Sequence, residues 1–367
     1  MNEISEQSLN MSAAQKNEIG EADCSAFASA PSSADSNLYE FICQGHLFRK
    51  AGLSPESVAA NLAEWQGLGL KLSQFLGFNP SECSASERQR IYHYYLPVFW
   101  WCKDQLSQHR SQFQNDEPIP ALVVGLSAPQ GCGKTTLVDA LEYLFNATGS
   151  RAASVSIDDF YLTAADQEKL AAENAGNALL EFRGNAGTHD LQLGTEALKS
   201  LRGLTSAEAK TKIPHYEKSS HHGHGDRANP STWREVQGPL EVLLFEGWML
   251  GFEPREDPKV ASIDPQLVAV NKNLKAYSDA WFSLVDSWII IEVEDPNWVF
   301  TWRLQAEVRM RAEGRPGMTD AEVADFVSRY MPAYKAYLPI LYSKGPSNAK
   351  PHHTLRFKIN KDRTPAD

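Results

Sequence analysis

The sequence predicts an α/β protein in which helices cover both faces of a parallel β-sheet. Two observations carry this prediction. After Pro118, short runs rich in Val, Ile and Leu alternate with helical segments, and continuous apolar strands of this kind are typical of a parallel sheet buried on both faces. A glycine-rich segment, Ala128–Thr136, follows the first of these runs and precedes an amphipathic helix, an arrangement that binds phosphate groups.

Length and composition are those of an ordinary globular protein. The 367 residues are 42% hydrophobic and 22% charged, so a substantial core can form in one large domain or two smaller ones. No apolar run is long enough to predict a helix that crosses a membrane. The net charge of −11 argues against a general binder of nucleic acid or anionic membranes. The sequence predicts no particular oligomeric state.

The cysteines and the amino-terminal residues indicate in which cellular compartment the protein is expected. Five cysteines are odd in number and include no C-x-x-C pair, so neither a disulfide framework nor a zinc ribbon is expected. The first residues lack the apolar segment of a secretory signal, and their acidic character disfavours a cleaved organelle signal. We therefore expect a reducing, cytoplasmic location.

The chain is predicted to have three parts. Residues 1–37 are rich in Ser, Ala, Asn and Glu and predict a disordered acidic tail. Residues 38–117 predict a helical region, in which Ser54 and Pro55 are typical of a helix start and Pro97 would kink a second helix. Residues 118–367 form the predicted α/β domain. Its expected strands are Ala121–Gly125, Ala153–Ile157, Val242–Phe245, Trp288–Val293 and Leu355–Ile359.

The glycine-rich segment has the pattern of a P-loop, which makes the P-loop NTPase fold the expected one. The residues predicted to bind the nucleotide phosphates are Gly131, Cys132, Gly133, Lys134, Thr135 and Thr136. In such a loop Lys134 reaches the β and γ oxygens of ATP, and the Thr135 hydroxyl binds Mg²⁺. The usual first glycine is replaced by Ala128, which is compatible with the loop if this residue does not need a positive φ.

Carboxylates stand at the ends of two other predicted strands. In an open α/β sheet the carboxyl ends of the strands form the ligand crevice. Asp158 could there accept the proton of a substrate hydroxyl that attacks the γ-phosphate, whereas its neighbour Asp159 is expected to cap the following turn. Glu246 ends a strand in the manner of a Walker B element and is predicted to hold Mg²⁺ directly or through water.

These elements together resemble the group of P-loop kinases that contains phosphoribulokinase, uridine kinase and pantothenate kinase. Over about Glu87–Pro365 the chain is most similar to the D-glycerate 3-kinases of the plant and cyanobacterial type. The segments that carry this similarity are Arg183–Asp190, Ile213–Ser219, Gly223–Arg227, Phe245–Phe252, Trp302–Glu307 and Phe326–Pro339.

The resemblance implies a fold and an activity. The fold implied is a five-stranded parallel sheet with flanking helices and a mobile helical lid. The activity implied is ATP-dependent phosphorylation of D-glycerate at its 3-hydroxyl, with Asp158 as the general base and Glu246 as the Mg²⁺-associated acid. The last strand and the residues after it, Lys361–Pro365, would then border the adenine.

Glycerate is a small anion, so its site needs a cation for the carboxylate and polar groups for the hydroxyls. Arginine forks bind carboxylates in a bidentate manner. The predicted substrate residues are Asp158, Tyr161, Arg183, His189, Asp190, Tyr216, Lys218 and Arg227. Among them Arg183, Lys218 and Arg227 are the candidate cations. An ordinary surface charge or a structural hydrogen bond is the alternative for each of them.

The lid is expected in the helix that follows Asp295. Arg303 and Arg311 lie eight residues apart, close to one helical face, and would add positive charge to the transferring phosphoryl group when the lid closes. The alternative is a solvated basic helix.

Two other functions remain open at this point. A related kinase could act on a nucleoside, on pantothenate or on another hydroxy compound. A nucleotide-dependent switch would bind the nucleotide without phosphorylating a small molecule, and it would need no base at Asp158. The sequence contains no Asn-Lys-x-Asp segment that would read guanine, which disfavours a GTPase.

Overall fold

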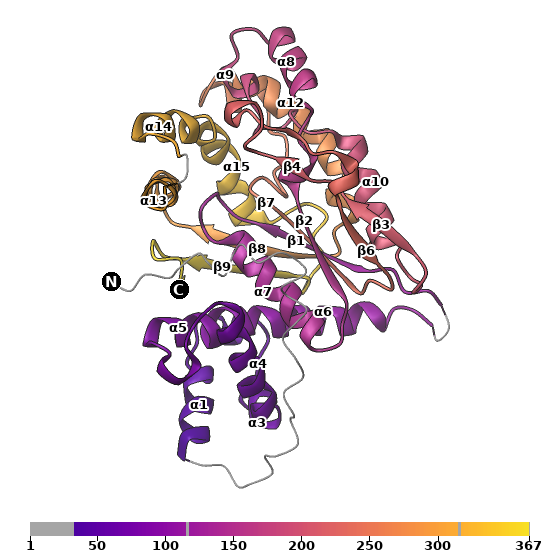
Figure 1. Ribbon diagram of the computed structural model, residues 1–367, viewed down its shortest axis with the longest axis vertical. Helices are drawn as coiled ribbons and strands as arrows, with labels where there is room; N and C mark the ends of the chain where they lie inside the picture. The colour runs from indigo at the N-terminus through magenta and orange to yellow at the C-terminus, as the bar shows by residue number, and fades with distance from the viewer. Residues whose placement is uncertain (1–32, 115–116, 315–316, 367) are drawn as a thin grey trace.

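The computed structural model describes residues 33–114, 117–314 and 317–366. Its centre is a six-stranded sheet in the order β10-β9-β8-β1-β7-β2, with helices on both faces (Figure 1). The strands are β1 (Leu122–Ser127), β2 (Ala152–Ser156), β7 (Val242–Gly247), β8 (Ser287–Val293), β9 (Thr354–Ile359) and β10 (Pro365–Ala366). All residues of β1 and β7 are buried, which explains their unbroken apolar composition.

The five predicted parallel strands are confirmed, each with its ends within two residues of the expected position. The sixth strand, β10, pairs antiparallel with β9 and was not predicted, because two residues beginning with a proline carry no periodic signal. Two small antiparallel sheets were missed as well. They are formed by β3 (Lys210–Ile213) with β6 (Arg234–Gln237) and by β4 (Tyr216–Glu217) with β5 (Asp226–Arg227).

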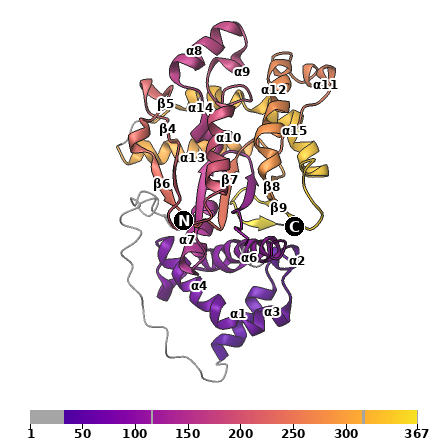
Figure 2. The same cartoon turned by 90° about the vertical axis from the view of Figure 1, so that its right-hand side faces the viewer.

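The helical region before the sheet packs beneath it and against α7 in both views (Figures 1 and 2). Its aromatic rings contact those of α7: Phe75 stacks on Tyr143 with 4.5 Å between the ring centroids, and Phe99 meets Phe145 edge to face at 5.0 Å. Aromatic side chains of the region therefore serve the core. The helices are α1 (Ser33–Cys43), α2 (Leu47–Lys50), α3 (Pro55–Ala60), α4 (Leu62–Phe75), α5 (Ala85–Arg90) and α6 (Leu96–Arg110).

Three details of this region differ from the prediction or refine it. Helix α1 begins at Ser33, inside the segment predicted as a tail, and the rest of that tail lies outside the described residues. Ser54 caps α3 as predicted, but the helix is divided from α4 at Asn61. The residues before Pro97 form a π-helix, Ile91–Tyr95, because the proline has no N–H and its ring would clash with the carbonyl four residues earlier.

The remaining helices surround the sheet. Strand β2 leads into α8 and strand β8 into α13, so these helices stand at the carboxyl ends of the strands, together with α9 and α14 (Figure 1). They are α7 (Lys134–Ala147), α8 (Ala164–Glu173), α9 (Ala178–Glu181), α10 (Leu191–Arg202), α11 (Asp257–Ala261), α12 (Leu267–Ala280), α13 (Trp298–Ala312), α14 (Asp320–Ser328) and α15 (Met331–Lys344). Helices α13 and α14 occupy the place expected for the lid, whose motion stays a prediction. Within the described residues no helix has the length and apolarity to span a bilayer.

Candidate active site

The P-loop connects β1 to α7 and has the backbone that its sequence predicts. Gly131 and Gly133 adopt φ angles of 77° and 93°, which favour glycine. Ala128 is not among the residues with positive φ, so alanine replaces the usual glycine without strain. A Cβ on Gly131 would lie 2.7 Å from Cβ of Trp302, so this glycine also allows α13 to pack on the loop.

The side chains of the loop face the neighbouring strand. Nζ of Lys134 donates to the carbonyl of Pro129 at 3.2 Å, and the Thr135 hydroxyl donates to Oε1 of Glu246 at 3.2 Å. Glu246 is 7% exposed, and burial raises the pKa of its carboxyl, although Lys134 opposes this shift. The sheet register, in which Leu126 of β1 lies opposite Glu246 of β7, brings these groups together.

This pair of oxygen donors fits a magnesium ion. Mg²⁺ prefers hard oxygen ligands and is usually held by one or two carboxylates together with waters and substrate phosphates. Thr135 and Glu246 supply one hydroxyl and one carboxylate beside the phosphate loop, and a buried carboxylate with a raised pKa is stabilised by a cation. Among the described residues no group of three acidic, His or Cys side chains could hold a metal alone, so the phosphates would have to complete this site.

Asp158 lies in a 3₁₀ turn, Ile157–Phe160, directly after β2. Its Oδ2 is 2.6 Å from Nζ of Lys218, and its side chain is 27% exposed. Burial opposes ionisation, but the charge of Lys218 and the hydrogen bonds from Lys218 and Tyr161 outweigh it and lower the pKa of Asp158 to about 2. The carboxylate is therefore ionised and available as a hydrogen-bond acceptor at neutral pH.

Asp159 has the capping role that the sequence predicted. Its Oδ2 accepts the backbone N–H of Ser156 at 3.2 Å, which closes a capping box at the start of the turn. Nδ1 of His215 lies 3.6 Å from the same carboxylate, and the interaction with Asp159 raises the pKa of His215. Asp159 thus stabilises the turn that presents Asp158.

Two predicted substrate residues, Tyr161 and His189, lie face to face beside Asp158. Their ring centroids are 4.4 Å apart, and their backbones form an isolated antiparallel bridge. Burial lowers the pKa of His189 to about 3, so its ring is neutral at physiological pH. Tyr216 lies at the edge of Tyr161, with 5.3 Å between the ring centroids.

The three candidate cations have different environments. Arg183 lies over the ring of Tyr216 at 5.6 Å and donates to the carbonyls of Gly223 and His224. Lys218 is paired with Asp158 and is 57% exposed.

Arg227 and Asp190, by contrast, are paired with each other. Nη2 of Arg227 donates to Oδ2 of Asp190 at 2.9 Å and to the carbonyl of Tyr161 at 3.3 Å. The other oxygen of Asp190 accepts the backbone N–H of Leu193 at 2.9 Å and caps α10. These contacts are structural hydrogen bonds, the alternative that the sequence left open, and a role of the two residues in substrate binding stays a prediction.

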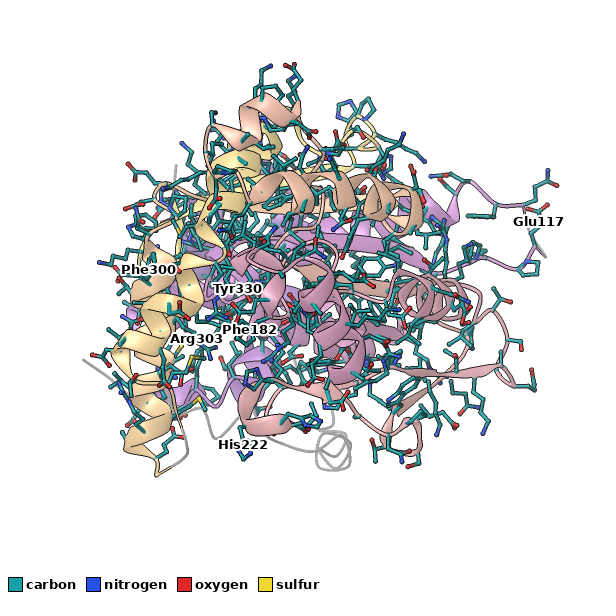
Figure 3. The ribbon with its side chains drawn as sticks, turned by 90° about the horizontal axis from the view of Figure 1, so that it is seen from above. Glu117, Phe182, His222, Phe300, Arg303 and Tyr330 are labelled. Atoms are coloured by element: carbon teal, nitrogen blue, oxygen red, sulfur yellow. The ribbon has the colours of Figure 1, made fainter. Side chains whose placement is uncertain are left out.

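The two lid arginines do not share an environment. Arg303 forms an ion pair with the buried Glu307 and lies 5.2 Å over the ring of Phe326. Arg311 instead pairs with Asp320 of α14 at 2.9 Å, at an exposed position. Figure 3 shows Arg303 near Tyr330 and Phe182, whereas Glu117 lies at the opposite edge of the molecule.

Several residues near the site were not predicted. Tyr334 accepts the backbone N–H of Gln130 in the P-loop at 3.0 Å, and Tyr330 packs at 5.0 Å on Trp248. Both tyrosines belong to the segment Phe326–Pro339, whose similarity to known kinases was the available signal. Arg363 donates to the carbonyl of Gly131 at 2.6 Å and lies 5.2 Å over the ring of Trp302. Its segment, Lys361–Pro365, was expected near the nucleotide, but no pattern distinguished this arginine.

Known proteins are similar to this chain in sequence. The chain is 53% identical to a protein of Arabidopsis thaliana named D-glycerate 3-kinase, chloroplastic, over 91% of this chain and 73% of that protein. It is 35% identical to an uncharacterized kinase of Schizosaccharomyces pombe, over 69% of this chain and 94% of the relative.

A solved structure is similar as well. The structure of D-glycerate 3-kinase from Cryptococcus neoformans matches 74% of this chain and 97% of its own, with a TM-score of 0.68 and 36% identity. The model of the phosphoribulokinase / uridine kinase family matches residues 123–344, which include the P-loop, Asp158, Glu246 and the lid. The chain therefore belongs to the phosphoribulokinase / uridine kinase family.

Proposed function

We propose that this kinase transfers the γ-phosphoryl group of ATP to the 3-hydroxyl of D-glycerate, giving 3-phosphoglycerate. The observation that carries this proposal is the ionised Asp158, held by Lys218 at the carboxyl end of β2, two strands from the P-loop. The names of the Arabidopsis and Cryptococcus relatives support glycerate as the acceptor.

The acceptor side of this site suits a small anion. Arg183 and Lys218 are its cations, and the groups that could form hydrogen bonds with the hydroxyls of the acceptor are Tyr161, His189 and Tyr216. The carboxylate of glycerate would form an ion pair with Arg183 or with the ammonium of Lys218. Asp158 would then accept a hydrogen bond from the 3-hydroxyl.

The reaction follows from these positions. The 3-hydroxyl oxygen forms a bond to the γ-phosphorus, the bond between this phosphorus and the bridging oxygen of ADP breaks, and the hydroxyl proton passes to Asp158. A carboxylate with a pKa of about 2 is a weak base. It suffices because the transition state is loose, and the hydroxyl becomes strongly acidic only as its oxygen binds phosphorus.

The nucleotide side of the site supplies positive charge. Lys134 and the N–H groups of the P-loop would bind the phosphate oxygens, and Thr135 and Glu246 would hold Mg²⁺. When bound, this ion neutralises charge on the β- and γ-phosphates. Arg303 of the lid would add charge when α13 closes, and closure would also exclude water.

The test is ADP release by the purified protein with Mg·ATP and one acceptor at a time. We expect a high rate with D-glycerate and little with L-glycerate, uridine, pantothenate or no acceptor. A flat response with tight ATP binding would overturn the proposal and favour another acceptor or a switch. Replacing Glu246 by Gln should raise the Mg²⁺ concentration needed for half-maximal rate, and an unchanged requirement would argue against its metal role.

We also propose a cytoplasmic location. The cysteines Cys43, Cys83, Cys102 and Cys132 are free thiols, which is consistent with a reducing compartment. Fractionation of the native cells with an antibody would test this, because recovery in an organelle or outside the cell would contradict it. The name of the Arabidopsis relative places that protein in the chloroplast, which makes the organelle fraction the informative one.

A further inference from the structure

The ring of His189 is buried and has one unsatisfied nitrogen. The residue is 5% exposed, and its ring lies between the face of Tyr161 and the edges of Tyr277 and Trp281. Nδ1 is 2.8 Å from the hydroxyl oxygen of Tyr277. Nε2 is buried without any hydrogen-bond partner. Buried polar atoms without partners are rare in proteins, so this nitrogen requires an explanation.

The hydroxyl of Tyr277, on α12, determines which nitrogen of His189 carries the hydrogen. Its oxygen accepts the backbone N–H of Gly187 at 2.8 Å and lies 2.8 Å from Nδ1 of His189. A phenolic oxygen has two lone pairs and one hydrogen. Tyr277 is 1% exposed, and among the described residues the contacts of its hydroxyl offer no acceptor other than Nδ1. A buried hydroxyl needs an acceptor, so the hydrogen of Tyr277 points to Nδ1, and the hydrogen of the neutral imidazole must then be on Nε2.

The backbone fixes this donor close to the proposed base. Leu162 donates to the carbonyl of Thr188 at 3.0 Å, and Asp190 donates to the carbonyl of Phe160 at 2.7 Å. These two bonds tie the segment of His189 to the turn of Asp158. The charge of Asp158 acts on the imidazole, and Tyr161, whose ring is stacked on His189, also lowers the pKa of Asp158.

We propose that Tyr277 is a positioning residue that holds His189 in the Nε2–H tautomer, so that His189 donates a hydrogen bond to an oxygen of the bound acceptor. This inference rests on the proposed function, in which the acceptor is a small hydroxy acid whose oxygens need donors. The bound acid supplies the partner that Nε2 lacks. A ring with its hydrogen on Nδ1 would present a lone pair on Nε2, which would repel a carboxylate oxygen and could only accept a hydrogen bond from a hydroxyl.

The tautomer can be measured without any substrate. In protein labelled with ¹⁵N-histidine, ring nitrogen shifts distinguish a protonated from an unprotonated nitrogen, and the spectrum of His189→Gln identifies the signals of His189 among the 10 histidines. We expect a hydrogen on Nε2 in the unaltered protein and a shift toward Nδ1 in Tyr277→Phe. An unprotonated Nε2 in the unaltered protein would overturn the inference, even if Tyr277→Phe failed to fold.

Kinetics then tests what the tautomer does. Tyr277→Phe should raise the KM for D-glycerate about tenfold, because a hydrogen bond to a charged or hydroxyl oxygen is lost, and should leave the KM for ATP unchanged. Tyr337→Phe is the matched control, since it removes a buried hydroxyl that donates to Oδ1 of Asn271 at 3.1 Å on α12. We expect this control to leave both constants unchanged.

A double variant separates positioning from packing. Glutamine at position 189 carries a side-chain N–H close to Nε2 that needs no tautomer. In the His189→Gln background, Tyr277→Phe should therefore change the KM for D-glycerate less than twofold. An equal effect in both backgrounds would overturn the inference. If the unaltered protein did not phosphorylate glycerate, the proposed function would fail, while the nitrogen shifts would still decide the tautomer.

Discussion

Nζ of Lys218 lies 2.6 Å from Oδ2 of Asp158, so the proposed base is held as an ion pair at the end of β2. Lys218 belongs to the segment between β4 and β5, more than fifty residues along the chain from its partner. The base therefore depends on a segment that forms no part of the central sheet. A lysine that holds the base can also bind the carboxylate of the acceptor.

Replacing Asp158 by Asn should abolish most of the turnover. The amide keeps the size of the side chain but cannot accept the hydroxyl proton, so we expect kcat to fall about 10²–10⁴-fold, with ATP affinity unchanged. Steady-state kinetics and nucleotide titration would measure the two quantities. Asp159→Asn is the matched control, because this neighbour caps the turn and should mainly lower the melting temperature. Full phosphotransfer by Asp158→Asn would contradict the mechanism.

Replacing Lys218 by Met should move the acid limb of the pH–rate profile to higher pH. In the unaltered protein burial opposes ionisation of Asp158, but the ammonium of Lys218 outweighs this effect and lowers the pKa of Asp158 to about 2. Without the ammonium, burial dominates and the pKa of Asp158 rises. Activity that needs the ionised carboxylate is present above this pKa and is lost as the pH falls through it. Measuring kcat/KM from about pH 4 to pH 8 would show the shift. An unchanged limb would mean that Asp158 does not govern it.

Much of the fold followed from the sequence because strand and loop signals are local. The runs that became β1, β2, β7, β8 and β9 are continuous and apolar, as parallel strands buried on both faces must be. The glycine-rich pattern predicted the P-loop, in which Gly131 and Gly133 have positive φ angles. The very short strands β4, β5 and β10 carry no such signal and are set by tertiary contacts.

The site was predicted less completely, because tertiary contacts, which carry no local sequence signal, determine how its residues pair. Residue types at strand ends indicated Asp158 and Glu246, but no local pattern shows which charges pair across the fold. The pairing of Arg227 with Asp190, and that of Arg311 with Asp320, appear only when segments distant in the chain come together. Tyr277 gave no signal either, because an isolated tyrosine on an amphipathic helix is typical of core packing.

Replacing Gly131 by Ala should disrupt nucleotide binding. The new Cβ would require a left-handed backbone and would lie 2.7 Å from Cβ of Trp302, so the loop or α13 must move. We expect at least a tenfold loss of ATP affinity in a nucleotide titration. Gly149→Ala is the control, since this glycine has a φ of 84° with no atom within 4 Å of the added carbon. Both variants should lose about 1–2 kcal/mol of stability, but only the first should lose affinity.

His189 should make the protein less stable in mild acid. Burial lowers its pKa from 6.5 to about 3, so the unfolded chain binds a proton that the folded chain excludes. The stability that the neutral ring contributes is complete above pH 6.5 and is lost as the pH falls toward 3. Urea unfolding at about pH 8 and pH 5 should show a smaller loss for His189→Gln than for the unaltered protein. Burial also lowers the pKa of His93, which should account for part of the remaining loss. Equal losses in both proteins would refute this assignment.

The two lid arginines should differ in their effect on catalysis. Arg303 follows Trp302, the residue that packs on the P-loop, and the buried Glu307 holds its guanidinium, whereas Arg311 forms an exposed pair with Asp320. We therefore expect Arg303→Met to lower kcat about 10²–10³-fold, since a positioned cation at the transferring phosphoryl group is lost.

Arg311→Met is the control in the same helix and should change kcat less than about twofold, because exposed ion pairs contribute only about 0–1 kcal/mol. Single-turnover kinetics with saturating Mg·ATP would separate the chemical step from product release for both variants. If Arg311→Met were the more damaging variant, α13 would have to rotate on closure and exchange the ion pair with Asp320 for contact with the phosphates. In that event Asp320→Asn, which releases Arg311, should raise kcat or leave it unchanged, and this would identify the opening of the pair as part of lid closure.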